Sequence, residues 1–322
     1  MKYYYAPMEG VTSYLLRNAH HRYFPGVDRY YMPFLSPSQD HLFTKRELRE
    51  IVPEHNEGVN VVPQLLTKRG EDFVWAAREL SAMGYREVNL NLGCPSGTVV
   101  AKGKGCGALG DLEALEVFLD EIFSAGLDIA ISVKTRLGLK DEGEFPHILE
   151  LYNRYPIAEL TIHPRVRQDM YKNRARLTPF AQALPQSKAP VCYNGDLVTA
   201  QQCRAFGERF PKVEAVMLGR GLIADPALAS KAAGGPGADK ERLGAFLEEV
   251  YRGYARDFES ERNAMLRMKE IWFYLIHLFE DSASYGKKLK KTTDHKAYEQ
   301  LVRDILRDLE LKPHLAGDVF QK

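Results

Sequence analysis

The 322-residue sequence has few of the features that mark secreted, metal-binding or membrane-spanning proteins. Its four cysteines form no C-x-x-C pair, and its histidines form no cluster at the spacing of metal ligands. No signal peptide is recognisable, and no apolar run approaches the roughly 20 residues that cross a bilayer. We therefore expect reduced thiols, no metal ion, no membrane contact and a cytoplasmic location.

An excess of charge of either sign is also missing. Lysine and arginine number 44 against 43 aspartates and glutamates, so the net charge is +1. A nucleic-acid partner would therefore have to be held by a local basic surface rather than by the charge of the whole chain. The length favours one large domain plus a smaller one.

Short apolar runs alternate with amphipathic stretches up to about residue 232. The predicted strands are residues 3–5, 29–31, 59–65, 87–91, 129–134, 159–162, 191–194 and 215–218. Eight strand-then-helix units fit an α/β fold of the (β/α)8, or TIM, barrel type, which usually takes about 250 residues. An open doubly wound sheet would carry G-x-G-x-x-G after its first strand, where this chain has Ala6-Pro7-Met8-Glu9-Gly10 instead.

The pattern changes after the linker Gly234-Gly235-Pro236-Gly237. Residues 242–258, 263–279 and 295–309 are predicted helices with no strand between them, so we expect a barrel domain over 1–235 and an all-helical domain over 236–322. Trp272, Phe273 and Tyr274 are expected in the core of the helical domain. The dense basic run at 287–291 is interpreted either as a solvated loop or as a binding surface.

Polar residues follow the predicted strands at their carboxyl ends, where barrel enzymes form their active sites. They are Pro7, Met8, Glu9, Gln64, Asn91, Cys94, Lys134, Arg136, His163, Arg165, Asn194-Gly195-Asp196 and Gly219-Arg220-Gly221. The last two groups follow strands seven and eight, where barrels often bind phosphate. Glycines there let backbone N–H groups approach an anion, and Arg220 adds charge-assisted hydrogen bonds.

The strand that ends before Cys94 has an unusual composition. Leu90 and Leu92 alternate with Asn89 and Asn91, and buried amides are costly unless their donors and acceptors are matched. This pattern predicts a strand that points polar groups into a site, followed by a turn that holds Cys94. A lysine and a glutamine at the same mouth, Lys134 and Gln64, suit a flavin ring, whose reduced form is anionic and whose edge is amide-like.

Together these motifs resemble the tRNA-dihydrouridine synthases, the flavin enzymes that reduce uridine in RNA. The resemblance covers nearly the whole chain. It rests on Ala6-Pro7-Met8-Glu9-Gly10-Val11-Thr12, Asn89-Leu90-Asn91-Leu92-Gly93-Cys94-Pro95, Val133-Lys134-Thr135-Arg136-Leu137-Gly138, His163-Pro164-Arg165, Tyr193-Asn194-Gly195-Asp196 and Gly219-Arg220-Gly221. Ser13 stands where the family usually has Asp, Pro164 stands within its common H-G-R motif, and Tyr171-Lys172-Asn173-Arg174-Ala175 lacks the usual Ala-then-aromatic ending.

The resemblance implies FMN as cofactor, NADPH as reductant and a flipped uridine of tRNA as substrate, in a monomeric enzyme. It implies the following roles. Pro7, Met8 and Glu9 line the flavin, Gln64 and Lys134 bind its ring, and His163 contacts it, while Asn194, Gly195, Asp196, Gly219 and Arg220 hold its phosphate end. Asn91 and Arg165 face the uracil, and Cys94 donates a proton.

The chemistry agrees with an acid role for Cys94. Hydride addition at C6 of uracil leaves C5 in need of a proton, and a thiol of ordinary pKa, about 8.5, is protonated near neutral pH. A cysteine nucleophile would need a base, which the turn lacks. The alternatives are an enzyme acting on ribosomal RNA, a small-molecule flavin reductase and a non-catalytic RNA-binding protein. The helical domain is the expected RNA surface, through its basic run.

Overall fold

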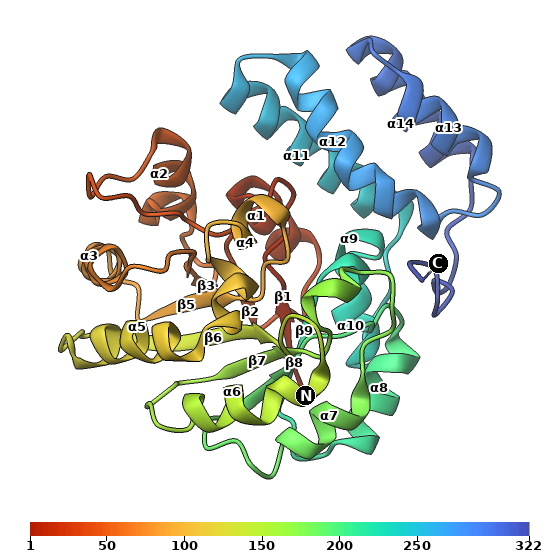
Figure 1. Ribbon diagram of the computed structural model, residues 1–322. Helices are drawn as coiled ribbons and strands as arrows, with labels where there is room; N and C mark the ends of the chain where they lie inside the picture. Colours follow the sequence, from red (N-terminus) through yellow and green to blue (C-terminus); the bar gives the residue numbers. More distant parts are fainter. Residues whose placement is uncertain (322) are drawn as a thin grey trace.

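The computed structural model describes residues 1–321, which form a barrel with a group of helices against one side of it (Figure 1). The sheet consists of strands β1 (Lys2–Tyr5), β2 (Arg29–Tyr31), β3 (Val61–Val62), β4 (Gln64–Leu65), β5 (Glu87–Leu92), β6 (Ala130–Arg136), β7 (Leu160–His163), β8 (Val191–Tyr193) and β9 (Ala215–Leu218). All neighbouring strands are parallel, in the order β3-β2-β1-β9-β8-β7-β6-β5-β4.

The two strands at the ends of this order, β3 and β4, are separated only by Pro63. Proline has no N–H to donate to a neighbouring strand, so the ladder is interrupted there. The carbonyl of Pro63 still accepts from Asn89 N at 2.8 Å. β3 and β4 therefore act as one interrupted strand that closes the barrel, which confirms the predicted (β/α)8 fold.

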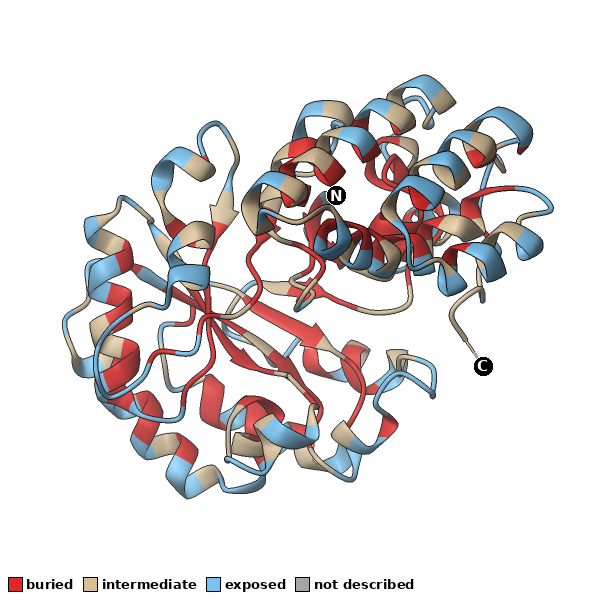
Figure 2. Ribbon diagram, turned by 90° about the horizontal axis from the view of Figure 1, so that it is seen from above, coloured by how far each residue is buried: buried red, intermediate tan, exposed pale blue. Residues whose placement is uncertain are grey.

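Helices cover the outer face of the barrel, and their buried faces are directed at the strands (Figure 2). They are α1 (Tyr14–Tyr23), α2 (Lys45–Ile51), α3 (Gly70–Ala82), α5 (Leu112–Ser124), α6 (Phe145–Tyr152), α7 (Leu177–Ala183), α8 (Ala200–Arg209), α9 (Arg220–Ala224) and α10 (Leu228–Ala232). The four-residue α4 (Gly97–Val100) has no buried residue and follows the turn of Cys94. In α5, for example, Leu115, Phe118, Leu119 and Ile122 recur at helical spacing and are buried, and Asp111 caps the first turn.

A second, smaller hydrophobic cluster contains residues of β1, β2, β3, β8 and β9 and the residue just after β1, namely Tyr4, Ala6, Tyr31, Val62, Cys192, Ala215 and Met217. Their strand positions alternate with those of the main core, so this cluster is the filling of the barrel. On the side of β4, β5 and β6 the buried residues include amides and hydroxyls, Gln64, Asn89, Asn91 and Ser132. The interior is thus apolar on one side and polar on the other.

The C-terminal helical region consists of α11 (Lys240–Phe258), α12 (Glu261–Leu275), α13 (Ala283–Lys291) and α14 (His295–Asp308). α11 packs on α1 and α12 packs on α9, so the region lies against one side of the barrel (Figure 1). Tyr254 of α11 shares a 2.7 Å hydrogen bond with Ser13, the residue that departs from the family motif. The linker lies between α10 and α11, and the division of the chain into two domains at residue 235 stays a prediction.

Two details of this region differ from expectation. The basic run lies in α13 rather than in a loop, with Leu289 buried and the four lysines Lys287, Lys288, Lys290 and Lys291 exposed. Trp272 is buried as predicted, but the prediction for Phe273 is wrong, because its side chain is 67% exposed. Adjacent residues on a helix face about 100° apart, so one of the pair faces the core and the other faces solvent.

After α14 the chain returns to the barrel. Backbone hydrogen bonds join Glu280 to Glu310 and Lys312 to Leu278, and Leu315 is buried. The segment then passes beside α9 and α10 (Figure 1). Within residues 1–321, no helix is both long enough and apolar enough to cross a membrane.

Candidate active site at the mouth of the barrel

A row of buried amides crosses the polar side of the barrel. Gln64 Nε2 donates to Asn89 Oδ1 at 2.8 Å, and Asn89 Nδ2 donates to Ser132 Oγ at 2.9 Å. One layer nearer the mouth, Asn91 Nδ2 donates to Gln64 Oε1 at 2.7 Å. Gln64, Asn89 and Ser132 are register partners on adjacent strands, so the parallel ladder itself brings them together. These paired amides fix one another's orientation.

The row ends at the turn that carries Cys94. Asn91 Oδ1 accepts from Gly93 N at 3.0 Å and from Cys94 N at 2.9 Å, and Cys106 N donates to Cys94 O at 3.1 Å. Cys94 is partly exposed, whereas Cys106, Cys192 and Cys203 are buried. Cys94 is therefore the thiol, among the four, that a ligand at the mouth can reach.

Arg136 holds the same turn from the neighbouring strand, a role that the sequence analysis did not assign. Its Nε donates to Gly93 O at 2.9 Å, and its Nη atoms donate to Val166 O and Met170 O at 3.1 Å. Its side chain is buried with carbonyl partners, and burial lowers its pKa below the usual value. Arg136 lies two residues beyond Lys134 on β6. Because side chains two residues apart on a strand share a face, this spacing was the sequence signal that could have identified it.

Lys134 is the register partner of Asn91 and lies beside the amide row. Burial lowers the pKa of Lys134 to about 8, and the positive charge of Arg136 adds to the effect. Among residues 1–321 its ammonium has no hydrogen-bond or ion-pair partner. Lys134 is half-buried, and an amine in such a position without a protein partner is suited to bind an electron-rich ligand.

His163, Arg165 and Asp196 form a network across the loops after β7 and β8. Arg165 Nη1 donates to His163 Nε2 at 3.0 Å, which makes that nitrogen an acceptor. Burial, followed by the charges of Arg136, Lys134 and Arg165, lowers the pKa of His163 well below its usual value, so the imidazole is neutral. Arg165 donates to both oxygens of Asp196, at 2.8 and 2.6 Å.

Arg165 is only 1% exposed, and its Nε donates to Asn173 O at 2.7 Å. The structure thus gives Arg165 internal partners, and its expected contact with a substrate stays a prediction. Asn91 is likewise 7% exposed, with its amide and carbonyl groups bonded to the protein. Both residues support their neighbours through these bonds, and their predicted place beside the substrate stays a prediction.

The two predicted phosphate loops lie against each other. Asp196 Oδ1 accepts from Arg220 Nη2 at 2.9 Å, and Asn194 Nδ2 donates to Met217 O at 2.7 Å. A Cβ atom at position 195 would lie 1.9 Å from the hydroxyl of Tyr193, so glycine is needed there. A Cβ at position 219 would lie 3.5 Å from Met8 Sδ, so the loop after β9 is adjacent to the loop after β1.

The three residues that follow β1 differ in exposure. Pro7 and Met8 are half-buried, and Met8 N donates to Thr12 Oγ1 at 2.8 Å. Glu9 is exposed and forms an ion pair with Arg46, just inside the start of α2. The loop is also held by the helical region, because Arg267 of α12 donates to Gly10 O.

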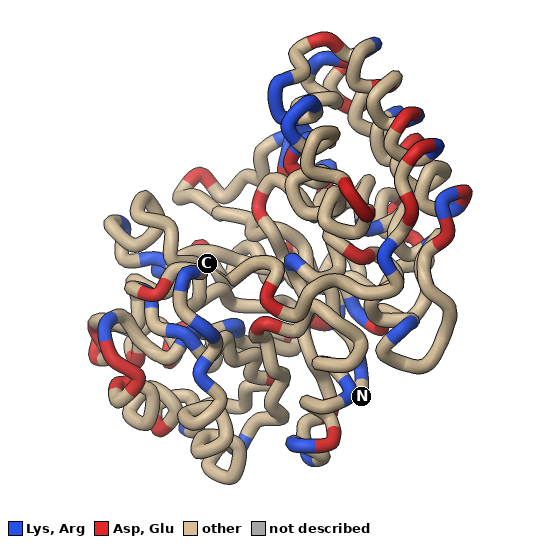
Figure 3. Tube along the Cα trace, turned by 90° about the vertical axis from the view of Figure 1, so that its right-hand side faces the viewer, with Lys and Arg blue, Asp and Glu red and all other residues tan. Residues whose placement is uncertain are grey.

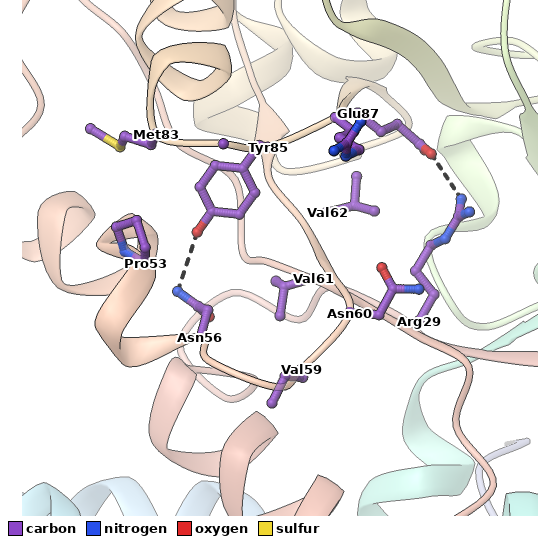
Figure 4. A pocket seen from close by; sticks show the side chains of 12 residues that line it. Arg29, Pro53, Asn56, Val59, Asn60, Val61, Val62, Met83, Tyr85 and Glu87 are labelled. Atoms are coloured by element: carbon purple, nitrogen blue, oxygen red, sulfur yellow. Dashed lines mark hydrogen bonds and ion pairs between the residues drawn. The ribbon is translucent and has the colours of Figure 1, made fainter.

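A cavity of about 390 Å³ lies elsewhere, at the amino ends of β2, β3 and β5 (Figure 4). Its lining includes the ion pair of Arg29 and Glu87, at 2.9 Å, and the hydrogen bond between Asn56 and Tyr85. It shares no residue with the predicted site. In barrel enzymes this end of the strands serves stability rather than catalysis, so we assign no chemistry to it.

The mouth is rich in positive charge. The charges of Lys134, Arg136 and Arg165 act on His163, and the carboxylate of Asp196 pairs with Arg165 and Arg220. No group of three or more metal-ligating side chains is present in residues 1–321. A parallel barrel with a reachable thiol, a half-buried amine and paired amides at the carboxyl ends of its strands has the arrangement of a (β/α)8 enzyme.

Comparisons with known proteins identify the class further. The family described as Dihydrouridine synthase (Dus) matches residues 4–312, so the chain belongs to the dihydrouridine synthase family, a family of oxidoreductases. The chain is 31% identical over 226 residues to the "Probable tRNA-dihydrouridine synthase 1" of Synechocystis sp., covering 69% of this chain and 62% of that protein. It is 30% identical over 227 residues to the "Probable tRNA-dihydrouridine synthase 2" of Bacillus subtilis, covering 69% of each.

Solved structures of distant proteins share the fold. A 2-naphthoyl-CoA reductase aligns with a TM-score of 0.56 at 13% identity, over 73% of this chain and 50% of that one. The old yellow enzyme homologue of Zymomonas mobilis aligns with a TM-score of 0.52 at 12% identity, over 74% of this chain and 90% of that one. At these identities the likeness is one of architecture alone.

Proposed function

We propose that this protein is an FMN-dependent dihydrouridine synthase that reduces uridine of tRNA to 5,6-dihydrouridine with NADPH. Membership of the family and the names of the relatives support the reaction and the RNA substrate. The observation that carries the proposal is the amide row with Lys134 beside it. The row runs from Ser132 through Asn89, Gln64 and Asn91 to the backbone of Cys94.

The residues at the mouth fit FMN because the half-buried amine of Lys134 has no partner among residues 1–321 and lies next to paired amides. We assign Gln64, Lys134 and His163 to the ring, with Pro7, Met8 and Glu9 along it. When bound, FMN supplies the hydride that adds at C6 of uracil. The ammonium of Lys134 would stabilise the negative charge of the reduced ring.

We assign the phosphate of FMN to the loops of Asn194, Gly195, Asp196, Gly219 and Arg220. The carboxylate of Asp196 is compensated by Arg165 and Arg220, so it fixes the position of Arg220 without making the mouth negative. The N–H groups of Arg220 that its protein partners leave unused would donate to phosphate oxygens.

Cys94 is assigned as the general acid that delivers a proton from Sγ to C5 of uracil, after which the thiolate recovers a proton from solvent. Asn91 and Arg136 hold its turn from two sides, so the position of the thiol is set by buried groups. Arg165 supports His163 and Asp196, and we keep Asn91 and Arg165 as the residues nearest to the uracil.

The helical region is proposed as the RNA surface. Lysines and arginines alternate with acidic residues along most of the chain trace (Figure 3), whereas α13 carries four exposed lysines with no ion pair among residues 1–321. Such a cluster would bind phosphate groups of the RNA backbone without reading sequence. The uridine would leave its stack to reach the barrel.

The test is reduction of defined RNAs by the purified protein. The protein should carry an FMN absorption spectrum, lose it on anaerobic addition of NADPH, and form dihydrouridine on unmodified tRNA. Ribosomal RNA fragments and free uridine, at the same uridine concentration, are the comparisons. Formation on ribosomal RNA alone would replace tRNA as substrate, reduction of free uridine at an equal rate would make the protein a small-molecule reductase, and a colourless protein without turnover would refute the flavin chemistry.

A further inference from the structure

The C-terminal segment is fastened to the barrel through its own carbonyl groups. Lys231 Nζ, on α10, donates to Pro313 O at 3.0 Å, and Gln202 Nε2, on α8, donates to Gly317 O at 2.9 Å. Arg220 Nη1, at the start of α9, donates to Phe320 O at 3.2 Å. The three donors are barrel side chains, and the last is the arginine assigned to the phosphate.

The ring of Phe320 adds a second contact to Arg220. The guanidinium carbon of Arg220 lies 5.4 Å from the centroid of the Phe320 ring and 5.5 Å from that of Tyr171, so it contacts two aromatic rings. Phe320 is itself held edge-to-face by Tyr274 and His277, at 5.5 and 5.7 Å between ring centroids. A chain of contacts thus runs from α12 through Phe320 to the mouth of the barrel.

Aromatic rings suit this task because they hold a guanidinium without cancelling its charge. Asp196 also orients Arg220, but a carboxylate so close weakens the attraction of the arginine for an anion. Contacts with ring faces restrict the rotamers of Arg220 and leave its positive charge available. An arginine that is already ordered loses less conformational entropy when a phosphate binds.

We propose that Phe320 is a positioning residue for Arg220, through which the C-terminal segment raises the affinity of the barrel for a phosphate-bearing flavin over its dephosphorylated form. This inference rests on the proposed function for the identity of the ligand. It makes the helical region part of the cofactor site, in addition to its assignment to RNA. Phe320 lies 100 residues along the chain from Arg220 and touches no reacting atom.

The test compares FMN with riboflavin, which has the same ring and no phosphate. The full-length protein is stripped of flavin, and the dissociation constants of both flavins are measured for the wild type and for Phe320→Ala, Phe320→Leu and Phe320→Tyr. We expect Phe320→Ala and Phe320→Leu to weaken FMN binding about 3- to 30-fold and to change riboflavin binding less than about 2-fold. Phe320→Tyr keeps the ring and should restore FMN affinity.

Tyr285→Ala is the matched control, because Tyr285 lies under the ammonium of Lys288 at 5.1 Å in the same helical region but away from the mouth. A second control removes the arginine: in an Arg220→Ala background, Phe320→Ala should have no further effect on FMN. Phe320 would have only a structural role if its replacement lowered the affinities for FMN and riboflavin equally. The same would follow if Phe320→Ala still weakened FMN binding in the Arg220→Ala background. Unchanged FMN binding in Phe320→Leu would refute the proposal outright. A wild type that binds FMN and riboflavin equally would instead refute the phosphate assignment of the proposed function.

Discussion

Asn91 fixes the backbone of Cys94: Asn91 Oδ1 accepts from Cys94 N at 2.9 Å, while the amide nitrogen of the same side chain is tied to Gln64. The reachable thiol is therefore connected to the polar side of the barrel interior. Since both ends of the amide are bonded to protein, the side chain has one stable orientation. The position of Cys94 is a property of the barrel as much as of its own turn.

Asn91→Leu should loosen this turn. The substitution leaves the N–H groups of Gly93 and Cys94 and the oxygen of Gln64 without a partner, and such losses cost about 1 to 3 kcal/mol each when buried. We expect a lower free energy of unfolding in urea and a large loss of dihydrouridine formation. Asn60→Ala removes one exposed side-chain hydrogen bond at the other end of the barrel and should change neither quantity much.

Cys94→Ala should impair the reduction of uridine without impairing the reduction of the flavin by NADPH. Loss of a general acid typically lowers a rate about 10² to 10⁴-fold, so dihydrouridine formation should fall by that order while reduction of the flavin by NADPH continues. Cys106→Ala is the matched control. Cys106 is fully buried, and burial raises the pKa of its thiol to about 11, so its replacement should leave turnover near normal. Normal RNA turnover in Cys94→Ala would remove the thiol from the mechanism.

Asp196→Asn should destabilise the protein strongly. Arg165 is 1% exposed, and removing the charge of its partner leaves a buried cation uncompensated, which costs on the order of 3 kcal/mol. Glu310→Gln breaks an ion pair with Lys240 in which the glutamate is 79% exposed, and should cost less than about 1 kcal/mol. The measurement is equilibrium unfolding in urea, and similar effects of the two substitutions would contradict the network at the mouth.

Lys134 should make stability rise with pH in alkaline solution. Its pKa is about 8 in the folded, flavin-free protein against 10.5 when unfolded, so between these values the unfolded state binds the extra proton. Stability relative to Lys134→Met should therefore increase from about pH 8 to about pH 10.5 and level off beyond. Urea unfolding of both proteins across this range is the measurement, since other groups that titrate there contribute equally to each. If the two proteins differ in free energy of unfolding by the same amount at every pH, then folding does not lower the pKa of Lys134.

The four lysines of α13 should set part of the salt dependence of RNA binding. Each phosphate contact contributes roughly 0.7 to 0.9 to the slope of log affinity against log salt concentration. Replacing Lys287, Lys288, Lys290 and Lys291 by Ala should therefore flatten the slope without altering flavin binding.

Replacement of three exposed lysines at the amino ends of strands, Lys2, Lys188 and Lys212, is the control and should leave the slope as it was. The salt series is run on unmodified tRNA with both variants. If the α13 variant keeps the wild-type slope, the RNA surface lies at the barrel rim, near Arg174.

Strand endings were the part of the fold and site that the sequence predicted best. A barrel brings the carboxyl ends of its strands to one mouth, so Gln64, Cys94, Lys134 and His163 were grouped by topology alone. What the sequence could not supply was the direction of each polar group. Asn91 and Arg165 are the same residue types whether they face a ligand or a neighbour, and only the partner atoms distinguish the two cases.

Contacts between distant segments also escaped prediction. Phe320 lies over Arg220 with 100 residues between them, and no periodicity or local motif encodes such a pair. α13 was left open because Leu289 is the one buried residue in a run of lysines, too weak a pattern for an amphipathic helix. Both features depend on the packing of the whole chain.

The interruption at Pro63 affects the order in which the strands of the barrel unpair during local opening. β3 and β4 each pair with their neighbour through only two register pairs, as β1 does with β2 and β8 with β9, against six between β5 and β6, so these pairings are among the shortest in the ring. Slow opening there would expose backbone amides to deuterium exchange before the longer pairing of β5 with β6 opens. Gln64 is the first residue after Pro63. A group that bonds to its side chain, as Asn91 does, therefore also stabilises the pairing of β4 with its neighbour.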